Sequence, residues 1–286
     1  MNDQRIAVIT DSGTDTPASF VAKHDIRVVP LRIYYSDGSS YESGVTITSA
    51  EVVERFKEEI PKTSLPSPDT IDDTFRRARA DGYKAAVFVT ISSGLSATYE
   101  TVSMVARQQK DFPVIVIDSK SIGAAAGLVV MEAARQIESG VPFTSLSRTL
   151  EITSRKTSVF FSVKTLEYLR RGGRINEATY RLGSVLNIKP VLTCNEAGRY
   201  VTVAKPRGWK RALDTEIKLA EEEARKYPKV RLAVCCSDAC ESHLMEMDRA
   251  LRRQIDNATE IVHSGVSPDL IVHTGPYLVG VAVQGL

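Results

Sequence analysis

Hydroxyl groups and a glycine follow the apolar run Ala85–Val89, in the stretch Thr90–Tyr99 with the sequence TISSGLSATY. A strand that ends in such a turn presents O–H and N–H donors at one edge of a sheet, where open parallel sheets bind anions. Ser92, Ser93 and Gly94 are therefore candidate ligands for a carboxylate or phosphate, and the glycine lets the backbone approach closely. Serine and glycine are also common in turns and helix caps, so a purely structural role is the alternative.

A second hydroxyl-rich stretch, Lys62–Pro68 (KTSLPSP), precedes an expected helix. Ser67 followed by Pro68 is typical of an N-cap and a first helical residue. That role does not account for Thr63 and Ser64, which are the further candidates of this stretch.

Arginines surround two glycine-containing turns, residues 169–174 (LRRGGR) and residues 205–211 (KPRGWKR). Adjacent glycines mark a tight turn. A guanidinium group binds carboxylate or phosphate through its planar fork of donors. The alternative for both segments is a solvated basic turn.

The stretch Ile271–Pro276 (IVHTGP) places His273 after an apolar run and before a Thr-Gly-Pro turn, so this histidine is expected at a turn. A histidine together with a serine would suit a hydrolase or acyltransferase that uses Ser93 and His273. The sequence contains no Gly-x-Ser-x-Gly elbow and no identifiable third member of a triad. It also lacks a Walker A loop and a Gly-x-Gly-x-x-Gly motif after the first strand, which argues against nucleotide binding.

Composition bounds the remaining classes of function. The chain has 286 residues, 43% of them hydrophobic, and a formal net charge of +2, so nothing favours nucleic acid or an anionic membrane as a partner. Neither a signal peptide nor a long apolar segment is visible, and we expect a cytoplasmic protein with at most transient membrane contact. Cys236, Cys240 and His243 lack a fourth ligand and a usual zinc spacing, so buried thiols are expected there and no metal.

Three units in the first half of the chain share one plan: an apolar strand, a polar turn and a helix. Continuous apolar strands that alternate with helices predict a parallel sheet covered on both faces. The three predicted strands are Arg5–Thr10, Ala85–Ile91 and Val114–Ile117. The sequence Thr48–Glu51 is a capping box that opens a further helix, expected to end near Ile60.

The pattern loosens after Gly140, and the second half is expected to be a smaller α+β unit. Two domains, residues 1–157 and 158–286, fit the chain length. Strands are predicted near residues 158–163, 189–193, 200–204, 230–236, 259–264 and 278–284, with helices near 209–226 and 242–254.

The ordered set of these motifs resembles the DegV family, the FakB-type bacterial fatty-acid-binding proteins, over essentially the whole chain. The motifs that carry the resemblance are ITDSGTD (residues 9–15), TSLPS (63–67), SSGLSATY (92–99), LEYLRRGGRI (166–175) and HTGP (273–276). It implies a Rossmann-like N-terminal domain, an α+β C-terminal domain and a long-chain fatty acid bound between them. It also implies an ATP-binding kinase partner of the FakA type, which phosphorylates the fatty-acid carboxyl group to give an acyl phosphate for phospholipid synthesis.

Under this resemblance the chain is a carrier that is not catalytic alone and needs no cofactor. Thr63 and Ser93 match the hydroxyls of the family that bind the carboxylate, and His273 completes their hydrogen-bond network. Arg174 and Arg207 match arginines needed for phosphoryl transfer or for docking the kinase.

The chain departs from the family pattern at Leu65, Ala97 and Tyr277, and Trp209 beside the second arginine turn is also unusual. Leu65 and Tyr277 are expected to alter the mouth of the pocket. Besides the Ser/His enzyme, a regulatory module that binds a sugar or nucleotide stays open as a further alternative.

Overall fold

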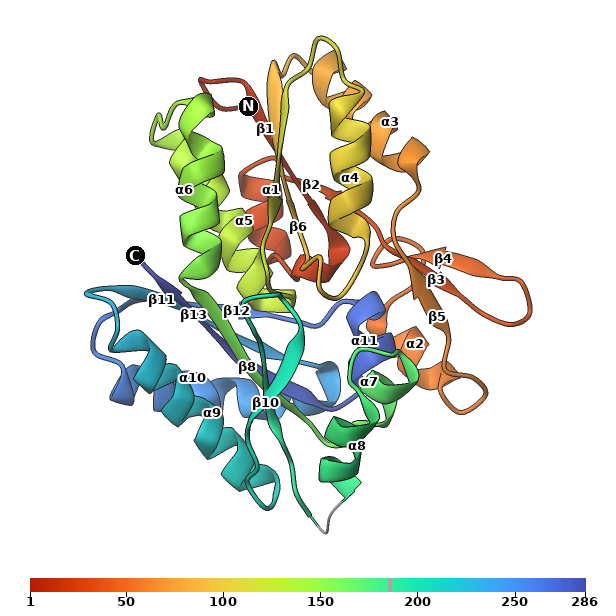
Figure 1. The fold of residues 1–286 in the computed structure, drawn as a ribbon, viewed down its shortest axis with the longest axis vertical. Helices are drawn as coiled ribbons and strands as arrows, with labels where there is room; N and C mark the ends of the chain where they lie inside the picture. Colours follow the sequence, from red (N-terminus) through yellow and green to blue (C-terminus); the bar gives the residue numbers. More distant parts are fainter. Residues whose placement is uncertain (185–186) are drawn as a thin grey trace.

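The computed structural model describes residues 1–184 and 187–286 and shows two lobes, one above the other in Figure 1. The first lobe contains a four-stranded sheet in the order β2-β1-β6-β7 with every strand parallel to its neighbours. Its strands are β1 (Ile6–Asp11), β2 (Arg27–Val29), β6 (Ala85–Thr90) and β7 (Val114–Asp118). The predicted parallel Rossmann-like sheet is confirmed.

Helices cover both faces of this sheet, because successive side chains of each strand point to opposite faces. Ile6 and Val8 of β1 pack with one group of helices, and Ala7 and Ile9 pack with another. The helices of the first group are α5 (Gly123–Glu138) and α6 (Phe143–Arg155), and those of the second are α3 (Pro68–Ala80) and α4 (Thr98–Arg107). The short helix α1 (Ala18–Lys23) follows β1.

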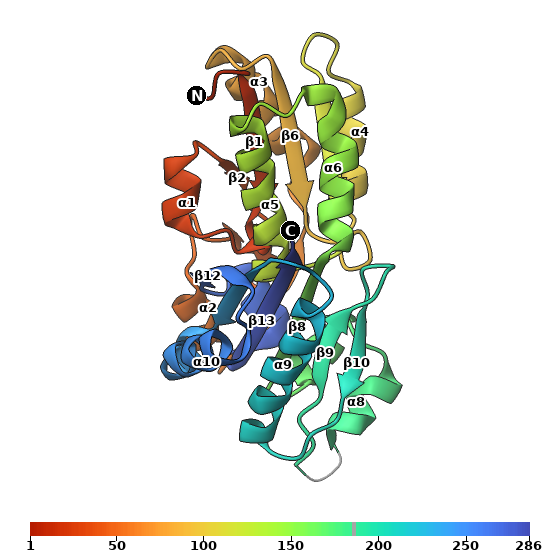
Figure 2. The same cartoon turned by 90° about the vertical axis from the view of Figure 1, so that its left-hand side faces the viewer.

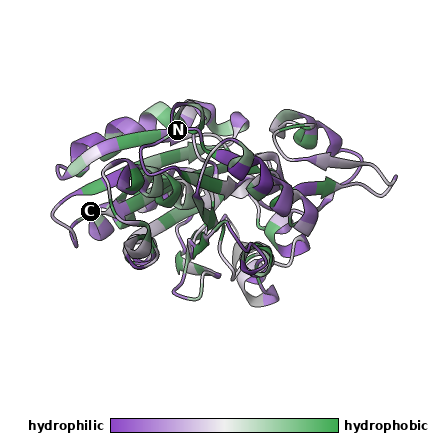
Figure 3. Cartoon of the chain, turned by 90° about the horizontal axis from the view of Figure 1, so that it is seen from above, coloured by the Kyte–Doolittle hydropathy of each residue, from purple (hydrophilic) through white to green (hydrophobic). Residues whose placement is uncertain are grey.

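The second lobe contains a mixed six-stranded sheet in the order β10-β9-β8-β13-β11-β12. Its strands are β8 (Thr157–Val163), β9 (Val191–Cys194), β10 (Tyr200–Ala204), β11 (Val230–Cys236), β12 (Ala258–Ser264) and β13 (Leu278–Gly285). The outer face is covered by α9 (Trp209–Ala224) and α10 (Glu241–Gln254), as Figure 2 shows. Hydrophobic residues concentrate on the central strands in Figure 3, and hydrophilic residues on the outer helices and loops.

Helix α5 belongs to both lobes, because it packs on β1 and β6 of one sheet and on β8, β11 and β13 of the other. Its first two turns are rich in Ala and Gly, so the backbone of α5 can approach the backbone around Thr14 closely. A Cβ added at Gly127 would lie only 2.6 Å from the carbonyl oxygen of Thr14. The predicted domain boundary near residue 157 stays a prediction. The chain does pass from the first lobe to the six-stranded sheet of the second lobe between the end of α6 and the start of β8.

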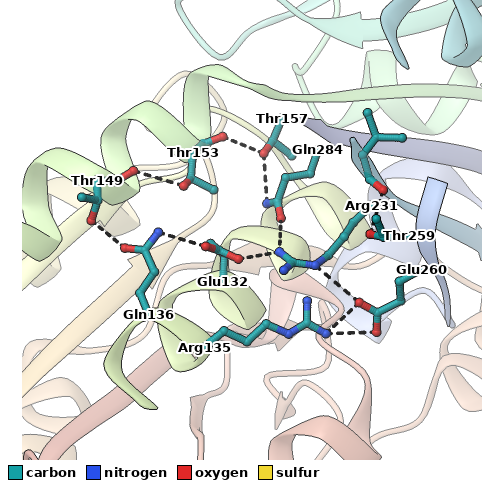
Figure 4. A network of polar contacts seen from close by, with 11 residues as sticks. Glu132, Arg135, Gln136, Thr149, Thr153, Thr157, Arg231, Thr259, Glu260 and Gln284 are labelled. Atoms are coloured by element: carbon teal, nitrogen blue, oxygen red, sulfur yellow. Dashed lines mark hydrogen bonds and ion pairs between the residues drawn. The ribbon is translucent and has the colours of Figure 1, made fainter. Parts of the chain in front are cut away.

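A polar network joins α5 and α6 to the strands of the second sheet (Figure 4). Arg135 of α5 donates to Glu260 of β12 at 2.8 Å, and Arg231 of β11 pairs with Glu132 of α5. Arg231 also donates to Gln284 of β13 at 3.1 Å. These charged groups are paired, so they can be partly buried between the lobes.

A small antiparallel sheet, β4-β3-β5, projects from the side of the molecule in Figure 1, at the height where the two lobes meet. It consists of β3 (Arg32–Tyr34), β4 (Ser40–Glu42) and β5 (Lys62–Ser64), with α2 (Ser49–Arg55) between β4 and β5. Helix α2 packs on α11 (Pro268–Thr274), which comes from the other end of the chain. The remaining helices are α7 (Glu167–Arg171) and α8 (Glu177–Ser184), with short 3-10 turns η1 (Ser12–Thr14) and η2 (Asp238–Cys240).

Three details correct the sequence expectations. Helix α2 ends at Arg55 rather than near Ile60. Helix α4 begins only at Thr98, so the polar turn predicted at residues 92–94 is the start of a longer loop. His273 lies in the last turn of α11, because the helix continues until Gly275 adopts a φ of 74° that suits glycine. No helix among the described residues is both long and apolar enough to span a membrane.

Candidate functional site

Three neighbouring cavities lie around α11, and the central one lies at the carboxyl end of the first sheet. The central cavity has a volume of about 260 Å³ and is lined mainly by apolar side chains, among them Leu31, Ile91, Leu95, Ile122 and Leu270. The outer cavity, of about 360 Å³, is lined by polar and charged groups such as Lys62 and Arg171. The inner pocket, of about 30 Å³, is lined by Val159, Phe161, Cys235, Val266 and Leu278 among others.

Shared lining residues show that the central cavity adjoins both of the others. Thr63, Arg174 and His273 line both the central and the outer cavity. Ile122 and Leu270 line both the central cavity and the inner pocket. Polarity therefore decreases from the outer cavity through the central cavity to the inner pocket, which is the arrangement an amphiphilic ligand requires.

A hydrogen bond of 2.7 Å joins Thr63 Oγ1 on β5 to His273 Nε2 on α11, at the junction of the outer and central cavities. Burial lowers the pKa of His273 from its ordinary 6.5 to about 3, and the nearby Arg174 cation acts in the same direction. The imidazole is therefore neutral at physiological pH. Its Nδ1 is buried and has no hydrogen-bond partner among the described residues.

Arg174 supplies a positive charge beside this pair. Burial of the guanidinium lowers the pKa of Arg174. Its Nη1 donates to the carbonyl of Gly172, and the described part of the chain gives it no ion pair with an acid. A partly buried cation without an acidic partner favours an anion in the adjoining cavity.

The first glycine of this segment, Gly172, is explained by close packing. Gly172 lies against the imidazole, and a Cβ at this position would overlap His273 Nδ1. Any larger residue would displace either the histidine or α7. The loop that carries Arg174 and the helix that carries His273 are therefore fixed relative to each other.

Thr63, Ser64, Arg174 and His273 are the sequence candidates that the structure brings to the cavity. The hydroxyl of Ser64 donates to the carbonyl of Leu65 at 3.2 Å. Arg207 lies elsewhere, exposed on the segment before α9.

Ser92, Ser93 and Gly94 are not among the residues that line the three cavities. Ser92 is fully buried and donates to the carbonyl of Gly198 at 2.9 Å, which joins β6 to the turn between β9 and β10. A Cβ at Gly94 would overlap the carbonyl oxygen of Ala197 in that same turn. Two of the three residues thus hold the lobes together.

The Ser93 hydroxyl accepts a hydrogen bond from Lys120 Nζ at 3.0 Å, and its N–H donates to Asp118. Among the described residues no serine hydroxyl bonds to His273. The arrangement that a Ser93–His273 hydrolase would need is therefore not formed.

Sequence reasoning missed several residues that line the cavity. Ser96, two positions beyond the candidate glycine, lines the central cavity and also accepts from the N–H of Thr98 at the start of α4. Tyr200 and Asp269 line it as well. Of Ser96, Tyr200 and Asp269, only Ser96 lies in a motif that the sequence analysis had singled out.

The residues that were considered as metal ligands and rejected, Cys236, Cys240 and His243, make other contacts. Cys236 and Cys240 are buried, and His243 accepts a hydrogen bond from Trp209 Nε1 at 3.2 Å. No group of His, Cys, Asp and Glu side chains within residues 1–184 and 187–286 has the geometry to hold a metal ion.

Comparisons with known proteins agree with this geometry. Residues 5–285 match the family model described as uncharacterised protein, DegV family. A DegV domain-containing protein of Clostridium acetobutylicum is 34% identical over 281 residues, which cover 98% of this chain and 99% of the relative.

Solved structures of similar proteins cover the whole fold. One, described as fatty acid binding of a DegV family protein from Thermus thermophilus, has a TM-score of 0.89 at 30% identity and covers 99% of this chain and 100% of that chain. A stearic-acid-binding protein from Eubacterium ventriosum has a TM-score of 0.88 at 26% identity and covers 98% of each chain. The chain belongs to the DegV family.

Proposed function

We propose that this protein binds a long-chain fatty acid, with its carboxylate at Thr63, His273 and Arg174. The observation that carries the proposal is the position of these three groups. A neutral Thr63–His273 pair and a guanidinium without an acidic partner stand where a polar cavity meets an apolar one. The two solved structures described above are of fatty-acid-binding relatives, which supports the same ligand class.

The apolar lining supplies the binding energy. Burial of each methylene group is worth about 0.8 kcal/mol, and binding entropy offsets part of the sum. The central cavity continues into the inner pocket between α5 and β8, so an acyl chain can extend from the carboxylate toward Phe161 and Cys235. The small volume of the inner pocket implies that these side chains move apart when the chain enters.

The head group needs hydrogen bonds because a carboxylate is costly to bury without them. When the neutral imidazole donates its single N–H to Thr63 Oγ1, the Thr63 hydroxyl proton stays available for the carboxylate, and Arg174 supplies the compensating charge. The outer cavity adjoins the same groups, so the second carboxylate oxygen is left accessible from that side.

We further propose that a separate ATP-dependent kinase phosphorylates this carboxylate to give an acyl phosphate for phospholipid synthesis. The protein would be the carrier subunit and would not be catalytic alone. Lys62 and Arg171 line the outer cavity, where they would attract the transferred phosphate. Arg207, exposed before α9, is the proposed docking residue for the kinase. Because this kinase would use ATP, we propose the cytoplasm as the location of the pair.

The binding proposal is tested by comparing hexadecanoic acid with hexadecanol, which shares the alkyl chain but not the carboxylate. Arg174→Met should weaken acid binding about tenfold or more, since it removes a charge-assisted hydrogen bond. Alcohol binding should stay unchanged. Arg148→Met, an exposed change on α6, is the matched control. Equal losses for both ligands would show that Arg174 does not contact the carboxylate.

The kinase proposal has a separate test. Arg207→Ala, loaded with hexadecanoic acid, should keep its ligand but fail to yield acyl phosphate with the kinase and ATP. Full turnover would refute the docking role. Loss of the bound acid would instead place Arg207 in the binding site.

A further inference from the structure

The inner pocket ends on the central strands of the second sheet. Phe161 of β8 and Cys235 of β11 line this pocket, and Gly280 of β13 is the register partner of both. Register partners on neighbouring strands point to the same face of a sheet. Phe161, Gly280 and Cys235 therefore form a row across three strands, which we call the end wall.

Gly280 leaves free the space that the other two residues of the end wall occupy. A Cβ placed on Gly280 would lie 2.9 Å from Phe161 Cβ and 3.0 Å from Cys235 Sγ. Both side chains thus already cover this glycine. A larger residue there would push them toward the pocket that they line, so the depth of the inner pocket depends on the absence of a side chain at Gly280.

The end wall is closed from behind. Successive side chains of a strand point to opposite faces, so Phe160, Val234 and Val281 lie on the far face of the same three strands. These residues are buried in the core that α9 and α10 cover. A ligand tail that reaches the end wall therefore meets a paired sheet with a densely packed layer behind it.

Phe161 has the largest side chain of the end wall. It is 3% exposed, and its ring makes an edge contact with the ring of Tyr200, with 5.2 Å between the two centroids. Tyr200 lines both the central cavity and the inner pocket. The aromatic pair therefore spans the route from the junction of these cavities to the end wall.

Resting on the proposed function, we propose that the end wall sets the longest acyl chain that the protein binds well. Each methylene group that still finds room raises the affinity about fourfold. Once Phe161 and Cys235 have moved apart as far as the sheet allows, a further carbon overpacks the core and lowers the affinity. Phe161 and Gly280 thus determine specificity at the methyl end of the ligand, away from Thr63 and His273.

Equilibrium binding of straight-chain saturated acids to the full-length protein tests this proposal. The series consists of the acids with an even number of carbons from dodecanoic to icosanoic acid. The unaltered protein should show one chain length of highest affinity, with weaker binding of the shorter and the longer acids. An affinity that still rises at icosanoic acid would overturn the proposal, because the ligand would then meet no end wall. If no acid of the series binds, the proposed function itself fails.

Variants assign the length limit to the end wall. Gly280→Ala should move the optimum to a shorter acid, and Phe161→Ala should move it to a longer one, with Phe161→Leu in its place if the larger truncation does not fold. Phe160→Ala is the matched control, because it removes a buried ring from the opposite face of the same strand. It should lower stability and leave the optimum unchanged. An optimum that stays at the same length in the Gly280 and Phe161 variants would contradict the assignment. Because the readout compares ligands on one protein, a partial loss of folded protein does not affect it.

Discussion

Thr63 and His273 are 210 positions apart in the sequence, yet they share a hydrogen bond of 2.7 Å. The bond joins β5 of the projecting small sheet to α11 of the second lobe, and α2 packs on the same helix. The head-group site therefore exists only when the small sheet lies against α11. Binding and the packing of this sheet are expected to depend on each other.

Thr63→Val should weaken fatty-acid binding about tenfold, because the change keeps the shape of the side chain and removes the hydroxyl. The unpaired His273 would also remain buried. Titration with a fluorescent long-chain fatty acid measures the effect. Thr144→Val, an exposed change at the start of α6, should bind as the unaltered protein does. Equal affinity for all three proteins would exclude Thr63 from the head-group site.

Gly94→Ala tests the structural role of the loop that follows β6. Its Cβ would overlap backbone atoms of Ala197 and Gly198, so the turn between β9 and β10 must shift. We expect a loss of about 1–3 kcal/mol in the free energy of unfolding, which urea denaturation measures. Gly265→Ala is the control, because open space surrounds that glycine. Unchanged stability together with lost lipid binding would support a direct ligand role for the loop instead.

His273→Gln should make the protein less sensitive to acid. The folded-state pKa of His273 is about 3 and its ordinary value is 6.5, so only the unfolded chain gains this proton between those two pH values. The unaltered protein then loses about 1.4 kcal/mol of stability per pH unit as the pH falls through this window, and the variant lacks this contribution. Urea unfolding at pH 6.5 and pH 5 should show the difference. Parallel pH profiles would mean that His273 is charged when folded.

Glu216→Leu should stabilise the protein at neutral pH. Glu216 is fully buried on α9, its two oxygens have no hydrogen-bond partner among the described residues, and burial raises its pKa well above the ordinary 4.5. The folded protein must then take up a proton, which lowers its stability above pH 4.5 and does so less as the pH falls toward that value. Glu222→Leu, an exposed change on the same helix, is the control. A gain that does not depend on pH would contradict a protonated Glu216.

Local patterns in the sequence were sufficient to predict β1, β6 and β7 of the first sheet, but not its short edge strand β2. Continuous apolar runs such as Ala85–Val89, each followed by a turn and a helix, leave few alternatives to buried parallel strands. The short strands β3–β5 were not predicted, because three-residue strands carry too little periodicity. Helix α11 was missed because its seven residues are nearly all buried and show no polar face.

The site could be predicted only in part, since its residues meet through contacts that are distant in the sequence. Thr63 and His273 were each singled out by a local motif, but only the resemblance to a family linked them, because no spacing rule does. Ser92 was expected to bind a ligand because no partner for its hydroxyl is visible nearby in the sequence. Its partner, the carbonyl of Gly198, lies 106 positions away. Asp269 gave no signal at all, because an aspartate after a proline at a helix start is an ordinary first-turn residue.

The most direct test of the central claim is the mass of the protein purified from a bacterial host, recorded under native and under denaturing conditions. The account predicts a native mass that exceeds the denatured mass by that of one long-chain fatty acid, which also identifies the acyl chain. Arg174→Met should show a reduced fraction of the heavier species. A protein that carries no such ligand, and that takes up no added fatty acid, would contradict the account.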